Sequence, residues 1–168
     1  QNLTLELPQP IDRPSLVETL TAVVDRHDAL RARLIEDDRG YGLDVAPPGQ
    51  VDVDGLVDRV SLDPAATAAD ITAAASAALD RALSQLDPMQ GVMVRFVWVD
   101  YGPDRGGRLI VAAHHLVIDG VSWRVIVPDL VAAWIALSQN QVPALPPVGT
   151  SLRRWSHGLL EEARSERR

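Results

Sequence analysis

"RLIVAAHHLVIDGVSW", residues 108–123, is the most informative stretch of this chain. Its apolar run ends in two adjacent histidines, His114 and His115, and an aspartate and a glycine follow at Asp119 and Gly120. An apolar run of this length, bounded by turn-forming residues, is typical of a buried strand. Histidine changes its charge near neutral pH, so a histidine at the end of a core strand can act as a general base.

The two histidines cannot both line one site if the strand stays regular, because successive strand residues point to opposite faces of a sheet. One imidazole then faces a cavity, and the other supports it by packing or hydrogen bonding. The chain contains neither lysine nor cysteine, so His115 is the best general base available. From spacing alone, a structural role for the pair is nevertheless the simpler interpretation.

The aspartate downstream is expected to hold a loop or to pair with an arginine. Arg31 and Arg95 are the two arginines that we consider as partners of Asp119. Gly120 would allow a tight reversal of the chain. A metal site needs three or four converging ligands, which the histidine pair and Asp119 supply poorly from different faces of a strand. We therefore predict no metal site.

Composition excludes several classes of protein. The chain has 168 residues, enough for one packed domain, and 46% of them are hydrophobic. Its formal net charge of -7 disfavours nucleic acid as a partner. The absence of lysine and cysteine from the sequence excludes Schiff-base and thiol chemistry, as well as disulfides. No apolar run reaches transmembrane length and the start lacks signal-peptide character, so we expect a soluble, cytoplasmic protein without a membrane partner.

Apolar periodicity predicts an α/β fold, in which helices pack on a mixed sheet as a two-layer sandwich. We expect a capping box at Ser15 and Glu18 to begin the first helix. The chain would divide into a lobe over residues 1–140, a Pro-rich linker over 141–149 and a helix over 150–168. The expected strands are residues 2–7, 32–35, 41–45, 91–100 and 107–115, and the expected helices are residues 12–31, 63–86, 122–137 and 150–168.

Three motifs together resemble one known family. "HHLVIDG" (114–120) matches the His-His-x-x-x-Asp-Gly signature of nonribosomal peptide synthetase condensation-type domains, which belong to a superfamily resembling chloramphenicol acetyltransferase. "RHDALRARL" (26–34) looks like the end of the family's early helix, and "LDPMQGVMVRF" (86–96) looks like the strand before the signature. The resemblance covers nearly the whole chain and implies the N-terminal lobe of that fold. Family domains are longer, with a second lobe that closes a tunnel.

The residues after the signature resemble the epimerization subtype. "VSW" directly follows Gly120, and "TSLRRWSHGL" (150–159) also looks like the epimerization pattern. The resemblance implies conversion of an L-aminoacyl or peptidyl thioester to its D epimer by removal and return of the α-proton. It implies the following site residues: a catalytic His115, a supporting His114, a structural Asp119, a close-approach Gly120 near the substrate channel, and Ser122 and Trp123 as candidate channel residues.

The resemblance also implies the partners. No cofactor would be bound directly, because the substrate would arrive on the 4'-phosphopantetheine arm of a peptidyl carrier protein. The second lobe would supply a glutamate, so we expect this chain by itself to be inactive. Three alternatives remain open: a condensation domain in which His115 orients or deprotonates an attacking amine, a non-catalytic module that docks carrier proteins, and a coenzyme A-dependent acyltransferase.

Overall fold

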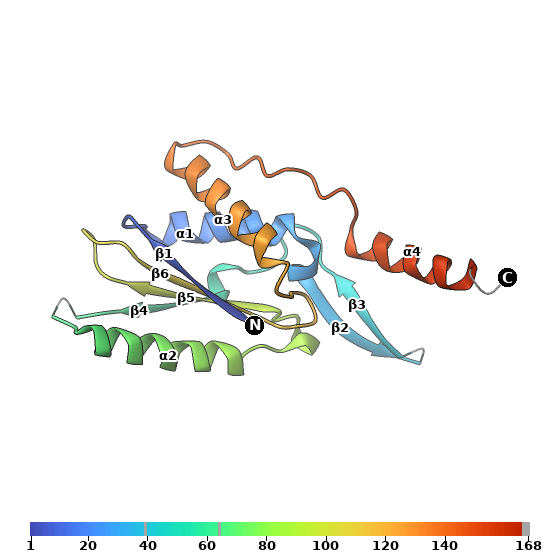
Figure 1. Ribbon diagram of the computed structural model, residues 1–168, viewed down its shortest axis with the longest axis horizontal. Helices are drawn as coiled ribbons and strands as arrows, with labels where there is room; N and C mark the ends of the chain where they lie inside the picture. The colour runs from blue at the N-terminus through green and yellow to red at the C-terminus, as the bar shows by residue number, and fades with distance from the viewer. Residues whose placement is uncertain (39, 64, 166–168) are drawn as a thin grey trace.

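The computed structural model describes residues 1–38, 40–63 and 65–165 (Figure 1). Along the described residues, helices separate groups of one to three strands, and three short 3-10 turns lie between these elements. The strands are β1 (Asn2–Leu7), β2 (Ala32–Asp37), β3 (Gly40–Val45), β4 (Val57–Ser61), β5 (Val94–Asp100) and β6 (Gly107–Ala113). The helices are α1 (Arg13–Arg26), α2 (Ala68–Ser84), α3 (Trp123–Ser138) and α4 (Leu152–Ser165).

Four strands form the main sheet, in the order β1-β6-β5-β4. β6 is antiparallel to both of its neighbours, whereas β4 and β5 are parallel, so the sheet is mixed as predicted. The remaining two strands, β2 and β3, form a separate hairpin that extends away from the sheet (Figure 1). This arrangement places β6 in the interior of the sheet, and the histidine pair follows directly at the end of this strand.

Helices cover both faces of the main sheet (Figure 1). Alternate residues of β5 point to opposite sides: Phe96 and Trp98 pack in the cluster with α1 and α3, and Val97 and Val99 pack in the cluster with α2. Burial on both faces explains why β5 and β6 read as nearly continuous apolar runs rather than alternating ones. The α/β fold and the mixed sheet are confirmed, but the sandwich has three layers and not two.

The first helix begins one turn earlier than the predicted capping box. The side chain of Asp12 accepts a hydrogen bond from the Ser15 N–H at 2.7 Å, so Asp12 is the N-cap, and Pro14 stands in the first turn. The predicted box at Ser15 and Glu18 is wrong because Ser15 already lies inside the helix, where it supplies the capped N–H.

The second helix begins later than residues 63–64. Thr67 and Asp70 form a reciprocal capping box there: the Asp70 N–H donates to the Thr67 hydroxyl, and the Thr67 N–H donates to the Asp70 carboxylate. Asp63 precedes the helix and accepts a hydrogen bond from the Ala65 N–H. Pro64 lies outside the described residues.

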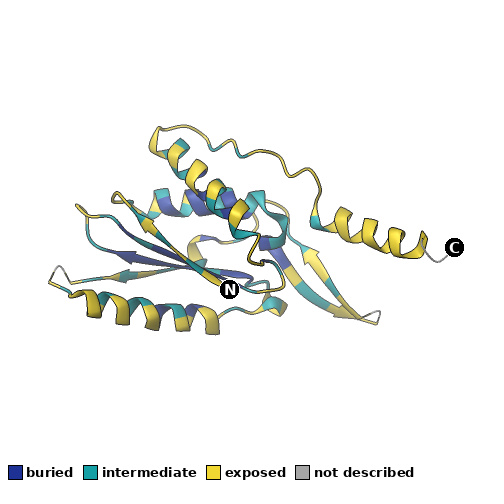
Figure 2. Ribbon diagram, viewed as in Figure 1, coloured by how far each residue is buried: buried dark blue, intermediate teal, exposed yellow. Residues whose placement is uncertain are grey.

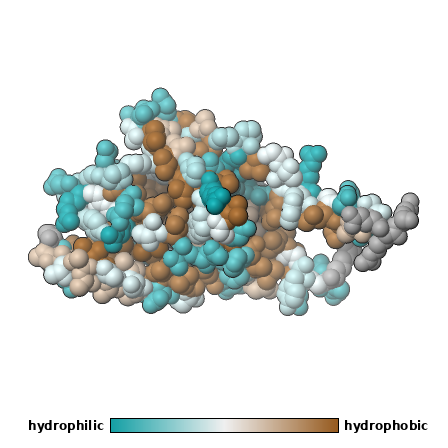
Figure 3. Space-filling model, viewed as in Figure 1, coloured by the Kyte–Doolittle hydropathy of each residue, from teal (hydrophilic) through white to brown (hydrophobic). Residues whose placement is uncertain are grey.

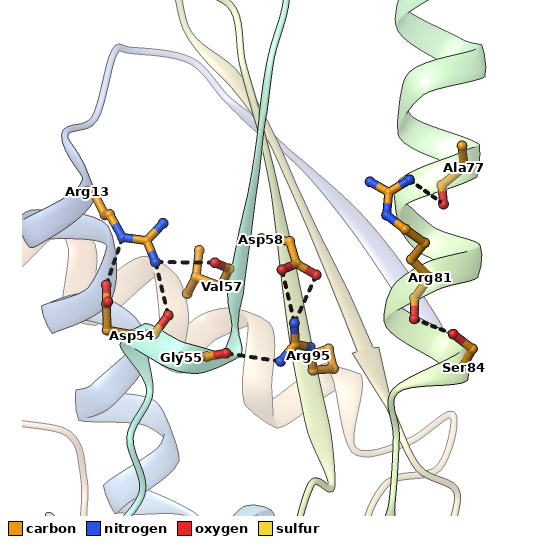
Figure 4. Close-up of polar contacts among 9 residues, drawn as sticks. All are labelled: Arg13, Asp54, Gly55, Val57, Asp58, Ala77, Arg81, Ser84 and Arg95. Carbon is orange, nitrogen blue, oxygen red and sulfur yellow. Dashed lines mark hydrogen bonds and ion pairs between the residues drawn. The ribbon is translucent and has the colours of Figure 1, made fainter.

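Strand β4 was not predicted from the sequence. Its five residues carry two charged side chains, Asp58 and Arg59, and this composition masks the apolar pattern. Side chains of neighbouring segments compensate: Arg95 donates two hydrogen bonds to Asp58 and one to the Gly55 carbonyl, which ties β5 to the start of β4 (Figure 4). Nη2 of Arg95 donates to both oxygens of Asp58 while Nη1 donates to the Gly55 carbonyl, so the guanidinium fixes the geometry as well as pairing the charge.

Helices α1 and α3 pack side by side above the sheet. His27 lies at the end of α1, and its side chain is only 14% exposed. Its Nε2 lies 2.8 Å from an oxygen of Asp129 on α3, so it also makes a polar link between the two helices. α3 begins at Trp123 and runs through Pro128 without interruption, close to the predicted residues 122–137.

The last helix stands apart from the sheet (Figures 1 and 2). Residues 139–151 contain neither helix nor strand, and α4 follows them, with the Ser151 hydroxyl accepting from the Arg154 N–H. None of its described residues is buried, although one side of it is apolar. Among the described residues, no helix is both long enough and apolar enough to cross a membrane.

Candidate active site

The histidine pair lies just beyond the end of a core strand. β6 ends at Ala113, and the next residue, His114, still donates its N–H to the Met93 carbonyl at 2.9 Å. A turn follows at once, closed by a bond from the Val117 N–H to the His114 carbonyl at 3.1 Å. Strand alternation therefore does not extend to His115, and the orientations of the two imidazoles are set by the turn.

His114 is the inner member of the pair. Its side chain is partly buried, and its Nδ1 accepts a hydrogen bond from the Leu116 N–H at 3.2 Å. Because Nδ1 is an acceptor, a neutral His114 ring carries its proton on Nε2. This contact fixes the ring against the turn that it begins.

His115 is the exposed member of the pair. Its Nε2 lies 3.1 Å from Nε2 of the Gln1 side chain, which comes from the strand edge beside β6. The imidazole is therefore accessible from outside the chain, and a neighbouring amide holds it. Sequence reasoning did not identify Gln1, because 114 positions separate the two residues and no local pattern connects them.

Asp119 organises the loop between the histidines and α3. One of its carboxylate oxygens accepts hydrogen bonds from the Ser122 hydroxyl at 2.6 Å, the Ser122 N–H at 2.8 Å and the Val121 N–H at 3.0 Å. These bonds, with the Ser122 hydroxyl making the largest contribution, lower the pKa of Asp119 below its ordinary value of 3.8. Positive charge on His115 lowers it further.

Neither arginine that we considered as a partner of Asp119 contacts it. Arg95 pairs with Asp58, and Arg31 donates to backbone carbonyls at the end of α1 and of β3. Asp119 is exposed at the surface of the described structure. Its structural role is thus a local cap on the turn that starts α3, and the expected arginine pairing is wrong.

The other residues of the loop have distinct positions. A Cβ added at Gly120 would meet no atom within 4 Å, and its backbone is not left-handed, so the reversal does not require glycine. The open space beside it is compatible with the approach of another molecule. The Ser122 hydroxyl is engaged by Asp119, whereas the Trp123 indole N–H points to the Gln1 carboxamide oxygen at 3.4 Å.

The described structure thus places His114, His115, Asp119, Ser122 and Trp123, which the resemblance implied as site residues, around one turn and loop, and it adds Gln1. Across residues 1–38, 40–63 and 65–165, the structure has no group of three acidic or histidine side chains with the geometry of a metal site. An exposed imidazole, held by a turn at the end of a core strand, is suited to general acid–base chemistry on a molecule that approaches from outside.

Comparisons with known proteins agree with this picture. The model of the Condensation domain family matches residues 1–168. The chain belongs to the condensation domain family. One of the linear gramicidin synthase proteins of Brevibacillus parabrevis is 33% identical over 173 residues, which is 99% of this chain and 2% of that protein. Tyrocidine synthase 1 of the same organism is 28% identical over 97% of this chain and 14% of its own length.

Two solved structures show how far the likeness of fold extends. The epimerization domain from the third module of tyrocidine synthetase B superposes with a TM-score of 0.79 at 25% identity, over 96% of this chain and 35% of that one. The condensation domain that mediates chain release from the enacyloxin polyketide synthase gives a TM-score of 0.68 at 23% identity, over 92% of this chain and 28% of that one. The fold is that of condensation and epimerization domains, and the chain spans about a third of their length.

Proposed function

We propose that this chain is part of an epimerization domain of a nonribosomal peptide synthetase. The substrate is an L-aminoacyl or peptidyl thioester on the 4'-phosphopantetheine arm of a peptidyl carrier protein, and the product is its D epimer. The observation that carries the proposal is the exposed imidazole of His115 at the end of β6, in the loop that Asp119 caps.

The chemistry follows from the acidity of a carbon next to a thioester carbonyl. His115 removes the α-proton, so that the C–H electron pair moves into the carbonyl and forms an enolate while the imidazole becomes an imidazolium. Return of a proton to the opposite face of the planar carbon inverts its configuration. That step needs a second acid–base group across the substrate, which we assign to a carboxylate in another part of the protein, because Asp119 is engaged by its own loop.

Two observations support epimerization over related reactions. The "VSW" that follows Gly120 puts Trp123 at the start of α3, beside the residue that contacts His115. The segment "TSLRRWSHGL" (150–159), which includes the start of α4, also resembles the epimerization pattern. The roles of His114 and Asp119 are then to hold the turn and the loop that carry the reactive imidazole.

A condensation domain is the second candidate. The family model and the chain-releasing condensation domain favour it, and there His115 would orient or deprotonate an attacking nucleophile. A non-catalytic docking module is a third, because a complex of the X-domain from teicoplanin biosynthesis with OxyB superposes with a TM-score of 0.77 at 22% identity. All three candidates involve a carrier protein or a partner enzyme.

Deuterium exchange separates these candidates. The intact domain that contains this chain is supplied with an L-aminoacyl carrier protein in D₂O. We expect deuterium at the α-carbon and a mixture of D and L thioesters without any amide product. His115→Ala should lower the exchange rate by roughly 10² to 10⁴, the usual contribution of a positioned acid–base group. His157→Ala, on the exposed face of α4, is the matched histidine control.

The other outcomes identify the alternatives. Amide formation only with a second loaded carrier protein, and no α-deuterium without it, would establish a condensation catalyst. Carrier binding with neither exchange nor amide formation would establish a docking module. Full exchange activity in His115→Ala would contradict the catalytic assignment of His115.

A further inference from the structure

The side chain of Gln1 reaches the site through the register of the sheet. The backbone nitrogen of Gln1 donates to the Ala113 carbonyl at 3.0 Å, and the Ala113 N–H donates to the Gln1 carbonyl at 2.9 Å. This pair of bonds continues the β1–β6 ladder by one residue beyond Asn2. Since Ala113 immediately precedes the histidine pair, the ladder fixes Gln1 beside His115.

The carboxamide of Gln1 bridges two ring nitrogens. Its Nε2 lies 3.1 Å from Nε2 of His115, and its Oε1 lies 3.4 Å from the indole nitrogen of Trp123. An indole N–H is a donor only, so it selects the carboxamide oxygen. The opposite amide orientation would set an NH₂ group against the indole N–H, donor against donor. The NH₂ group of Gln1 is therefore the end that faces His115.

The orientation of the amide determines the tautomer of the histidine. An amide NH₂ group donates and cannot accept, so Nε2 of His115 must offer a lone pair. The proton of the neutral ring is then on Nδ1. His114 has the opposite assignment, because its Nδ1 accepts from the Leu116 N–H. The two adjacent histidines thus carry their protons on different nitrogens.

We propose that Gln1 is a positioning residue that, together with the Trp123 indole, holds His115 as the tautomer with its lone pair on Nε2. This inference rests on the proposed function of His115 as a base. The NH₂ group must move aside when a substrate C–H approaches Nε2. The contact between the NH₂ group and Nε2 is therefore made only with the neutral ring, because an imidazolium would set an N–H against the NH₂ hydrogens.

Nitrogen NMR of the histidine rings tests the tautomer directly. In the intact domain labelled with ¹⁵N-histidine, the signals of His115 are those that disappear in His115→Ala. We expect the wild type to show protonated Nδ1 and unprotonated Nε2. Gln1→Ala should shift the population toward the Nε2–H form. Gln1→Glu should shift it further, because a carboxylate only accepts and therefore requires an N–H at Nε2.

Two further variants separate positioning from general structure. Trp123→Phe keeps an aromatic ring but removes the indole N–H, so the amide loses its fixed orientation and the His115 signals should become a mixture of tautomers. Thr4→Ala changes an exposed residue of β1 that contacts neither ring, and it should leave the tautomer and the exchange rate unchanged. Gln1→Ala should lower kcat for α-proton exchange roughly 5- to 10-fold with KM unchanged, the rate equivalent of one lost hydrogen bond.

The results distinguish this inference from the proposed function. Identical His115 signals in wild type, Gln1→Ala and Gln1→Glu would overturn the inference, whatever the activity. A tautomer that changes as expected in a domain without any α-proton exchange would support the positioning role and reject only epimerization. A KM effect at unchanged kcat would also overturn the inference, because it would make Gln1 a substrate contact.

Discussion

At the scale of single residues, the geometry of the site depends on hydrogen bonds that Asp119 accepts within its own loop. Asp119 is exposed, yet it accepts three hydrogen bonds from residues two and three positions downstream. Because these bonds favour the charged carboxylate, the pKa of Asp119 is lowered, chiefly by the Ser122 hydroxyl. The negative charge also lies near His115, whose charge lowers the pKa of Asp119 further.

The lowered pKa predicts a pH dependence of stability. A carboxyl group whose folded pKa lies below its unfolded value contributes stability above that unfolded value, and the contribution is lost as the pH falls through the folded pKa. Asp119→Asn should therefore lower the melting temperature near neutral pH, and the difference from wild type should decrease below pH 3.8 and vanish once the pH falls below the lowered, folded pKa. Thermal unfolding of both proteins across this pH range measures the difference.

The serine that lowers this pKa provides the control. Ser122→Ala removes the strongest hydrogen bond of Asp119. In this background, the effect of Asp119→Asn on the melting temperature should therefore depend less on pH. A melting difference between wild type and Asp119→Asn that stays constant at every pH would contradict the assigned role of the charge.

At the scale of elements, one arginine connects a helix to the hairpin. Arg31 is 8% exposed, and its Nη1 donates to the carbonyls of Val24 and Asp25 at 2.8 and 2.6 Å. Its Nε donates to the Ala46 carbonyl at 2.9 Å, just after β3. The guanidinium therefore satisfies carbonyls at the C-terminal end of α1, where a positive charge also interacts favourably with the helix dipole.

Loss of this arginine should destabilise the whole domain. Arg31→Ala leaves these carbonyls without a donor, and we expect a loss of unfolding free energy on the order of 3 kcal/mol. Arg31→Lys should recover less than half of it, because an ammonium cannot reproduce the planar fork of donors. Urea unfolding at equilibrium measures both changes.

The neighbouring Arg33 serves as the control. It is exposed and pairs with Asp44 at 3.3 Å, so Arg33→Ala should change the unfolding free energy by less than about 1 kcal/mol. An Arg31→Lys variant as stable as wild type would show that charge alone, and not the fork of donors, links α1 to the hairpin.

At the scale of the whole molecule, the outer side of α3 is apolar. Figure 3 shows apolar surface where α3 crosses the front of the molecule. We call this surface the α3 face, and its large side chains are Val121, Val125, Val131 and Ile135, which are 65%, 53%, 45% and 46% exposed. Contiguous apolar surface of this kind is typical of interaction sites.

The α3 face predicts self-association of the 168-residue chain. The weight-average mass in sedimentation velocity should rise with concentration. A double variant, Val125→Glu with Ile135→Glu, should remain monomeric and keep its melting temperature, because both side chains are exposed. Val142→Glu, in the linker after α3, is the control and should associate like wild type. A chain that stays monomeric at every concentration would contradict this prediction.

Elements with strong local periodicity could be predicted from the amino-acid sequence. The apolar runs of β5 and β6, the hairpin of β2 and β3, and the amphipathic helices were predicted close to their observed positions, because a strand or helix buried on one or two faces must repeat apolar residues at a known spacing. The signature around His115 was likewise readable, because its spacing lies within seven consecutive residues.

Contacts between segments that are distant in the chain emerged only with the folded structure. β4 is held by a parallel neighbour and by Arg95, 37 positions from Asp58, and its own five residues carry no clear pattern. Three other features also depend on contacts between distant segments: the third layer, the partners of Arg31 and the contact of Gln1 with His115. Hydrogen bonds and packing act through space, so their partners are fixed only when the sheet register and the helix positions bring them together.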